Sequence, residues 1–226
     1  MTKLPSKIRK QKSRVLVVDD HPIIRRGLAD LINQEADLDV CGEATDAHEA
    51  IAMVASLKPD IALVDISLKE LSGIELIKHL KARNAKLPML VLSMHDETLY
   101  AERALRAGAR GYVMKQEPPE TVIGAIRKVL SGEIYVSEKM SSRLISRMAD
   151  GSTDATGSPL ERLSDRELEV FQLIGQGLRT RQIAERLCLS IKTIESYREH
   201  IKHKLDLQNS TELFQHALQW VQGQGQ

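Results

Sequence analysis

The sequence predicts two modules of different fold class, a doubly wound parallel α/β unit followed by an all-α unit. Three observations lead to this prediction. Short apolar strand-like runs alternate with amphipathic helix-like runs between residues 14 and 131. A stretch of small and polar residues, 150–159, then interrupts the pattern. From residue 163 onward the apolar periodicity is helical, and no strand-like run appears.

Composition agrees with an ordinary globular protein, since 42% of the 226 residues are hydrophobic and 28% are charged. No apolar run has the length of a membrane span, and the amino-terminal residues lack a signal-peptide core. The two cysteines, Cys41 and Cys188, fall in different predicted modules, so we expect reduced thiols. These features favour a cytoplasmic protein that does not associate with membranes.

The net charge of +1 conceals a segregation of charge along the chain. Residues 1–13 carry five Lys/Arg and no acid, and we expect them to form a disordered basic arm. Residues 14–135 carry 15 Lys/Arg against 19 Asp/Glu, whereas residues 179–204 carry seven Lys/Arg against three Glu. The last excess suits a polyanion such as nucleic acid, although from charge alone a solvated helical face is the simpler explanation.

The α/β prediction rests on five strand-like runs, near residues 14–18, 38–42, 60–64, 88–92 and 110–114. Each is followed by an amphipathic helix-like run, near 23–35, 46–57, 73–83, 97–107 and 119–131. Pro22 suits a first helical turn, and Gly108 marks a return from helix to strand. Five such units with short connections predict a (βα)5 parallel sheet with helices on both faces.

The all-α prediction begins with a capping box, because Ser164 is followed three residues later by Glu167. Helices are expected near 164–175, 179–187, 190–205 and 209–221. The two middle helices are separated by a turn of three residues, which is the spacing of a helix-turn-helix. The predicted divisions are an arm (1–13), an α/β domain (14–132), a linker containing a helix near 138–149 (133–160) and a helix-turn-helix domain (161–224).

Charged and polar groups follow the predicted strands. Asp19 and Asp20 come after the first strand, Asp65 after the third, Ser93 after the fourth and Lys115 after the fifth. Each alone is an ordinary turn, cap or surface residue. Together they lie at the carboxyl ends of parallel strands, where open sheets bind ligands. Converging carboxylates repel one another, and a divalent cation that prefers oxygen ligands relieves that repulsion.

Residues 14–132 resemble a response-regulator receiver domain. The matching segments are Val-Val-Asp-Asp-His-Pro at 17–22, Asp65 with Leu-Ser-Gly-Ile-Glu-Leu at 71–76, Leu-Ser at 92–93, and Gly-Ala-Arg-Gly-Tyr-Val-Met-Lys at 108–115. The resemblance implies that Asp65 is the phosphoacceptor. It implies switch roles for Ser93, Lys115 and Tyr112, although Tyr112 by itself is equally a packing residue. It also implies Mg²⁺ (or Mn²⁺) held by Asp19, Asp20, Asp65 and the backbone carbonyl of Ser67.

Two positions depart from the receiver pattern. Lys69 stands four residues after Asp65, where the family often has proline, and Met94 follows Ser93, where a small residue is common. Neither change removes a reacting group, but both bear on phosphate lifetime and donor access.

Residues 163–221 resemble the four-helix DNA-binding domain of the LuxR/NarL/FixJ class, with a generic helical bundle as the alternative. The match runs through Leu-Ser-Asp-Arg-Glu-Leu-Glu-Val at 163–170, Gln-Ile-Ala-Glu-Arg-Leu at 182–187 and Ser-Ile-Lys-Thr-Ile-Glu-Ser-Tyr-Arg at 190–198. Ile191, Ile194, Ile201 and Leu205 recur at helical spacing, so we expect them to pack inward. The implied DNA-binding residues are Lys192, Thr193, Glu195, Ser196, Tyr197, Arg198, Glu199 and Lys202. Many relatives have histidine at the position of Tyr197, and the two glutamates are otherwise surface charges that balance Arg198 and His203.

The two resemblances together imply a bacterial transcription regulator of a two-component system. A sensor histidine kinase or phosphotransfer protein would phosphorylate Asp65, and the phosphorylated homodimer would bind a double-stranded DNA operator. We hypothesise that the unphosphorylated receiver masks residues 190–205.

Two alternatives stay open. One is a receiver that acts as a phosphate-independent scaffold. The other is an enzyme, such as a nucleotide-binding protein or a phosphatase, although no glycine-rich phosphate loop follows the first strand. Beyond accepting and losing its own phosphoryl group, we expect no substrate turnover.

Overall fold

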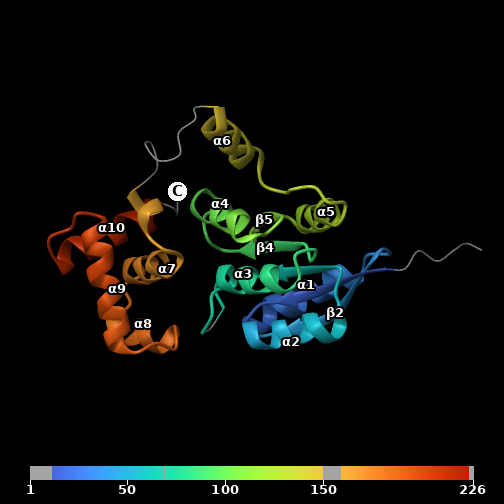
Figure 1. Ribbon diagram of the computed structural model, residues 1–226, viewed down its shortest axis with the longest axis horizontal. Helices are drawn as coiled ribbons and strands as arrows, with labels where there is room; N and C mark the ends of the chain where they lie inside the picture. The colour runs from blue at the N-terminus through green and yellow to red at the C-terminus, as the bar shows by residue number, and fades with distance from the viewer. Residues whose placement is uncertain (1–11, 69, 150–158, 224–226) are drawn as a thin grey trace, which may run out of the picture.

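A computed structural model of the protein describes residues 12–68, 70–149 and 159–223. Figure 1 shows an α/β module (residues 12–130) that contains one twisted sheet and a helical module (residues 159–223) beside it. The predicted fold class, a parallel α/β unit followed by an all-α unit, is therefore confirmed.

The sheet has five parallel strands in the order β2-β1-β3-β4-β5. The strands are β1 (Ser13–Val18), β2 (Leu38–Ala44), β3 (Ile61–Val64), β4 (Met89–Ser93) and β5 (Gly111–Met114). The chain runs from β1 outward to β2 and then crosses to β3 on the other side of β1. The carboxyl ends of β1 and β3 therefore flank the switch point at which sheets of this type bind ligands.

Helices cover both faces of the sheet. They are α1 (Pro22–Asn33), α2 (Ala47–Leu57), α3 (Gly73–Arg83), α4 (Glu97–Ala107) and α5 (Pro119–Leu130). Val15 and Val17 of β1 pack in a core with α1 and α5, whereas Leu16 and Val18 pack in a second core with α2, α3 and α4. The central strands β3 and β4 are buried on both faces, which is why they are nearly continuous apolar runs.

Local sequence sets where these helices begin. The side chains of Asp46, Ser72 and Asp96 accept hydrogen bonds from the first backbone amides of α2, α3 and α4. Pro22 and Pro119 occupy the first turns of α1 and α5, where a missing amide hydrogen costs nothing. The observed strands and helices of this module begin and end within a few residues of the predicted bounds.

The helix expected near 138–149 is present as α6 (Glu138–Ala149). Met140 is buried in the same core as α4, and Arg143 donates to the Thr98 carbonyl oxygen at 3.3 Å. Residues 150–158 of the predicted linker lie outside the described residues, as do residues 1–11 of the predicted basic arm. The last residue assigned to that arm, Ser13, already belongs to β1.

The helical module contains a short 3₁₀ helix η1 (Pro159–Arg162), α7 (Asp165–Gly175), α8 (Thr180–Arg186), α9 (Ile191–Lys204) and α10 (Ser210–Gly223). The predicted capping box of Ser164 and Glu167 is present at the start of α7. At Gly175, an added Cβ would lie 2.3 Å from the Ala217 carbonyl oxygen, so this glycine permits the close approach of α7 and α10. Within the described ranges, none of the helices has the length and apolar character that a membrane span requires.

Candidate functional site

Three carboxylates meet at the carboxyl edge of the sheet. Asp19 and Asp20 follow β1, Asp65 follows β3, and these two strands pair through Val18 and Val64. The Asp65 amide donates to the Val18 carbonyl oxygen at 2.9 Å, which continues the pairing as far as the acid. One carboxylate oxygen from each aspartate lies within 4.8 Å of the others. The structure thus brings together the three acids that the sequence places at strand ends.

Lys115, which follows β5, reaches across the sheet edge to two of these acids. Its Nζ atom lies 2.8 Å from Asp65 Oδ2 and 2.7 Å from Asp19 Oδ2, and all three side chains are buried. The Lys115 amide donates to the Ser93 carbonyl oxygen at 2.9 Å, which fixes the backbone from which the side chain extends. Burial alone would lower the pKa of Lys115, but the two carboxylates outweigh it and the pKa is raised. The lysine is therefore a permanent positive charge at this edge.

The second oxygen of Asp65 is left without a partner. Asp65 Oδ1 is buried and accepts no hydrogen bond among the described residues. Burial raises the pKa of Asp65, and Lys115 only partly opposes this shift. Unpartnered buried carboxylate oxygens are costly unless a ligand uses them. Three carboxylates with hard oxygen atoms are the donor set that Mg²⁺ and Mn²⁺ prefer, so these residues fit such a cation.

Two further residues belong to the edge in ways that the sequence reasoning missed. His21 Nδ1 lies 2.7 Å from Asp20 Oδ1, and the ring is about half exposed. Ser67, predicted to act through its backbone carbonyl, also places its hydroxyl at this edge, where Ser67 Oγ lies 2.7 Å from His95 Nε2. His21 could have been found because it directly follows Asp19 and Asp20 in the sequence. Nothing in the sequence indicates that Ser67 and His95 are in contact.

Ser93 and Tyr112 lie behind the acids. Ser93 is fully buried at the end of β4, and its Oγ atom accepts from the His95 amide at 3.2 Å. Tyr112 of β5 points inward and is 1% exposed, with its hydroxyl donating to the His95 carbonyl oxygen at 2.7 Å. Burial raises the pKa of Tyr112, so its hydroxyl stays a proton donor. Tyr112 thus lies inward, in contact with the loop that follows Ser93.

The outer face of α9 is open in the helical module. Its exposed members are Lys192, Glu195, Ser196 and Glu199, and its partly exposed members are Thr193, Tyr197, Arg198 and Lys202. The Ser190 side chain caps the helix by accepting from the Thr193 amide at 3.0 Å. Glu199 pairs with Lys202 at 2.9 Å, not with Arg198 or His203. This face therefore presents positively and negatively charged side chains, which are hydrogen-bond donors and acceptors, to solvent.

Two expectations about α9 are wrong. Ile194 and Ile201 are fully buried as predicted, and Leu205 is partly buried, but Ile191 is 49% exposed because it lies at the first turn beyond the packed surface. The hypothesis that the α/β module masks residues 190–205 does not match this structure either. Figure 1 shows α7 facing the α/β module, and α9 packs on α7, α8 and α10.

Comparison with known proteins agrees with both halves of the geometry. The family model for the response regulator receiver domain matches residues 15–127. The model for bacterial regulatory proteins of the luxR family matches residues 161–217. The chain belongs to the LuxR family of response regulators. It is thus a two-component transcription regulator with a receiver domain and a LuxR-type helix-turn-helix domain.

Two relatives of this LuxR-family regulator match over nearly the whole chain, and a third matches over part of it. It is 36% identical over 209 residues to the oxygen regulatory protein NreC of Staphylococcus aureus (strain MRSA252), covering 91% of this chain and 96% of the relative. RcsB of Salmonella enterica serovar Typhimurium, solved bound to promoter rprA with the phosphomimetic BeF3⁻, is 28% identical with a TM-score of 0.63, covering 92% and 98% of the two chains. A LuxR-family regulator from Aurantimonas sp. SI85-9A1 is 32% identical with a TM-score of 0.58, covering 62% and 99%.

In this LuxR-family chain, His95 connects the acidic edge to the DNA-binding module. Its ring bonds to Ser67 and stacks on Tyr100 with centroids 4.6 Å apart, and Tyr100 donates to Gln172 Oε1 of α7 at 3.1 Å. Burial lowers the pKa of His95 to about 4, so the ring is neutral near pH 7. Neither His95 nor Tyr100 was singled out from the sequence, since their contacts depend on the placement of the second module.

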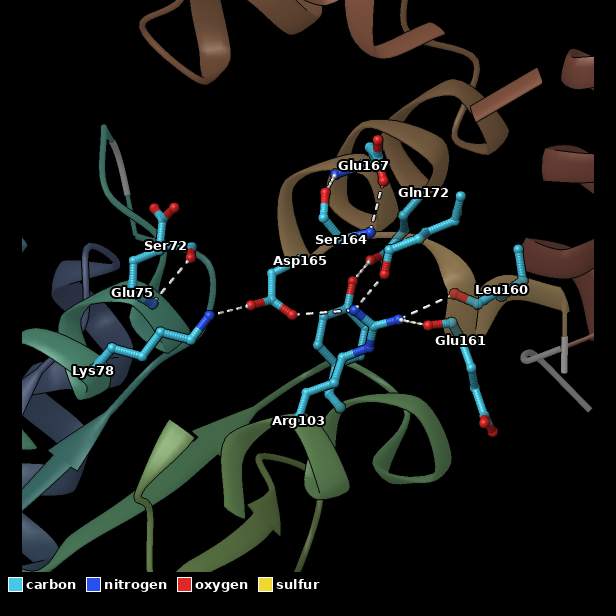
Figure 2. A network of polar contacts seen from close by, with 12 residues as sticks. Ser72, Glu75, Lys78, Arg103, Leu160, Glu161, Ser164, Asp165, Glu167 and Gln172 are labelled. Carbon is cyan, nitrogen blue, oxygen red and sulfur yellow. Dashed lines mark hydrogen bonds and ion pairs between the residues drawn. The ribbon is translucent and has the colours of Figure 1, made fainter. Parts of the chain in front are cut away.

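Arg103 of α4 makes the densest contact between the modules (Figure 2). Its guanidinium donates to the carbonyl oxygens of Leu163 at 2.7 Å and Leu160 at 3.0 Å, and to Asp165 Oδ1 at 3.1 Å. The other oxygen of Asp165 accepts from Lys78 Nζ of α3 at 2.9 Å. Arg103 is thus surrounded by acceptors from η1 and the start of α7.

Proposed function

We propose that Asp65 is the phosphoacceptor of this regulator and that a sensor histidine kinase or phosphotransfer protein supplies the phosphoryl group. One observation carries the proposal. Asp65 has one oxygen held by Lys115 and the other buried without a hydrogen bond, so a single oxygen is left to react. An attacking carboxylate held in a fixed direction reacts faster than a freely rotating one.

The reaction forms an acyl phosphate. A free Asp65 oxygen attacks phosphorus, the phosphorus–nitrogen bond of the phosphohistidine breaks, and its electron pair returns to the imidazole, which takes up a proton. Lys115 is charged and within reach of the same carboxylate, so it stabilises the negative oxygens of the transferred group. Loss of the phosphoryl group to water restores the carboxylate, without turnover of any separate substrate.

Asp19, Asp20, Asp65 and the backbone carbonyl of Ser67 would hold Mg²⁺ (or Mn²⁺) at this edge. When bound, such an ion neutralises acids that would otherwise repel an incoming phosphoryl anion. The spacing of the carboxylate oxygens, within 4.8 Å of one another, supports this assignment.

Ser93 and Tyr112 act as the switch. Ser93 Oγ is a hydroxyl at the edge that accepts from the His95 amide. When a phosphoryl group arrives, the Ser93 hydroxyl donates to one of its oxygens. The loop that carries His95 moves with Ser93, and the Tyr112 hydroxyl, which bonds to the His95 carbonyl oxygen, moves in turn. Because His95 also contacts Tyr100, this motion loosens the contact with α7.

The released protein binds double-stranded DNA as a homodimer in the cytoplasm, with α9 in the major groove. Glu195, Ser196 and Glu199 have short or acidic side chains that accept from or donate to base edges. The residues assigned to the DNA backbone are Lys192, Tyr197, Arg198 and Lys202, and Thr193 is a further DNA-binding residue. Their full or partial exposure along α9 supports contact with DNA, and the similar protein RcsB has been solved bound to promoter DNA.

Labelling with a small phosphodonor tests the proposal. The purified protein is treated with phosphoramidate and Mg²⁺, and its intact mass and phosphorylated residue are measured. We expect one added phosphoryl group on Asp65, none in Asp65→Asn, and full labelling in the control Asp30→Asn, which changes an exposed aspartate of α1. Equal labelling of Asp65→Asn would refute the assignment.

A further inference from the structure

A cavity of about 470 Å³ lies over the acidic edge, and both modules line it. Asp20, Ser67 and His95 form the receiver side. Gln172 of α7, Arg186 of α8 and Cys188 of the turn that follows α8 form the opposite side. The DNA-binding module therefore stands directly in front of the groups beside Asp65.

The contacts around Arg103 hold this wall in place (Figure 2). Asp165 accepts from both Arg103 and Lys78, so one carboxylate ties α7 to α3 and α4 together. Arg166 adds a further contact, because it lies 3.2 Å from Glu75 of α3 and donates to the Glu70 carbonyl oxygen. These bonds are charged and partly buried, and they act between modules joined through α6 and the segment that follows it.

The surface around the cavity decides what can dock at Asp65 in this arrangement. A cavity of 470 Å³ lies within the range of small-ligand pockets. A phosphohistidine on a protein helix must also dock a broad surface around the acceptor. The α7–α8 wall occupies that surface.

We propose that the DNA-binding module is a specificity element for phosphotransfer: while closed, it admits small phosphodonors to Asp65 and excludes proteins that carry phosphohistidine. This inference rests on the proposed role of Asp65. The residues that enforce it are Arg103 and Asp165, which hold the wall, and Gln172 and Arg186, which form it.

The charge of the wall suits a small anion. Arg186 is the cation of this wall, and its charge partly opposes the burial that raises the pKa of Glu169. Glu169 is paired with Arg166 at 2.8 Å, and Glu185 is paired with Arg181 at 3.1 Å. The positive charge of Arg186 acts on the site itself, since it is one of the groups that lower the pKa of His95. A small phosphodonor that enters the cavity therefore meets the positive charge of Arg186.

Two phosphodonors that share an imidazole leaving group but differ in size distinguish exclusion by size from a difference in chemistry. Phosphoimidazole is the small donor, and a four-helix phosphotransfer protein phosphorylated on its histidine is the large one. In both reactions an Asp65 oxygen bonds to phosphorus, the phosphorus–nitrogen bond breaks, and its electron pair stays on the imidazole, which is then protonated. Initial rates of Asp65 phosphorylation are measured with excess Mg²⁺ for the full-length protein and its variants.

The variants open the wall without touching the acids. Arg103→Ala removes the central donor, and Asp165→Ala removes its acceptor from the other side. Arg106→Ala is the matched control, because Arg106 lies on the same helix and pairs within it, with Glu102 at 2.6 Å. We expect the protein donor to react about tenfold faster with either opening variant, while the phosphoimidazole rate stays within about twofold.

Each outcome decides the matter. An unchanged phosphoimidazole rate also establishes that the variant receiver is folded. If the protein-donor rate is unchanged in both opening variants, or if both donors accelerate equally, the size filter is refuted. Failure of phosphoimidazole to label Asp65 in the unmodified protein would instead refute the proposed function itself.

Discussion

Replacing Lys115 with methionine removes the only positive charge that lies within ion-pair distance of both Asp19 and Asp65 among the described residues. Methionine preserves most of the side-chain volume, so the main loss is electrostatic. The two carboxylates stay buried, at 1% and 3% exposure, without a counter-ion. Removing one partner of a buried ion pair costs about 3 kcal/mol, or roughly 10 °C in the melting temperature of a module of this size.

The stability lost in Lys115→Met depends on pH. Burial already raises the pKa of Asp65, and removing Lys115 raises it further. A carboxyl whose folded-state pKa is raised stabilises the fold when protonated, so the stability of Lys115→Met increases as the pH falls through that pKa. We therefore expect a larger deficit near about pH 8 than near about pH 5. A bound divalent cation supplies the missing charge, and excess Mg²⁺ is expected to restore part of the stability.

Urea unfolding followed by far-UV circular dichroism measures this effect, at both pH values and with or without Mg²⁺. The control is Lys86→Met, which changes an exposed lysine and is expected to alter the free energy of unfolding by less than about 0.5 kcal/mol. If Lys115→Met matches the control near pH 8, or if its deficit does not change with pH, the electrostatic account of the acidic edge is wrong.

Four further predictions address other parts of the molecule. Gly175→Val is expected to destabilise the helical module by about 2 kcal/mol or more, because the new side chain meets the Ala217 carbonyl oxygen; Gly124→Ala, in open space, should be neutral or slightly stabilising in the same urea assay. His95 has a lowered pKa of about 4, so closure should weaken as the pH falls below about 6.5, and the radius of gyration measured by small-angle X-ray scattering should then increase; His95→Gln should abolish that pH dependence. Lys202→Ala should weaken binding to all DNA sequences alike and reduce the salt slope by about one, whereas Glu195→Ala should change sequence preference, both measured by fluorescence anisotropy. Removal of divalent cations with EDTA should suppress Asp65 labelling by phosphoramidate, and added Mn²⁺ should restore it as Mg²⁺ does; labelling unaffected by EDTA would contradict the assigned cation site.

Features that depend on residues close together in the sequence could be predicted. The run 61–64 is apolar throughout and ends in Asp65, and in the structure it is a central strand buried on both faces. The Ser164 capping box is likewise a local signal, since both partners lie within one turn. Such features depend on neighbours along the chain or on the edge shared by all parallel strands.

Features that depend on the relative placement of the two modules could not be predicted. Arg103 is one charged residue on an amphipathic helix, and nothing in its surroundings along the chain selects the carbonyl oxygens of Leu160 and Leu163 as its partners. The same is true of Tyr100 and Gln172, which are 72 residues apart. The expectation that the receiver would mask α9 was wrong for this reason: periodicity identifies the inner face of a helix, but not the helix that a neighbouring module contacts.

A comparison of operator affinity before and after phosphorylation is the most direct test of the account. Genomic fragments recovered with the phosphorylated protein supply the operator, and its dissociation constant is measured with and without phosphoramidate and Mg²⁺. We predict that phosphorylation tightens binding by about tenfold in the unmodified protein and has no effect on Asp65→Asn. An equal gain in affinity by Asp65→Asn, or no gain by a fully phosphorylated protein, would contradict the claim that this carboxylate governs DNA binding.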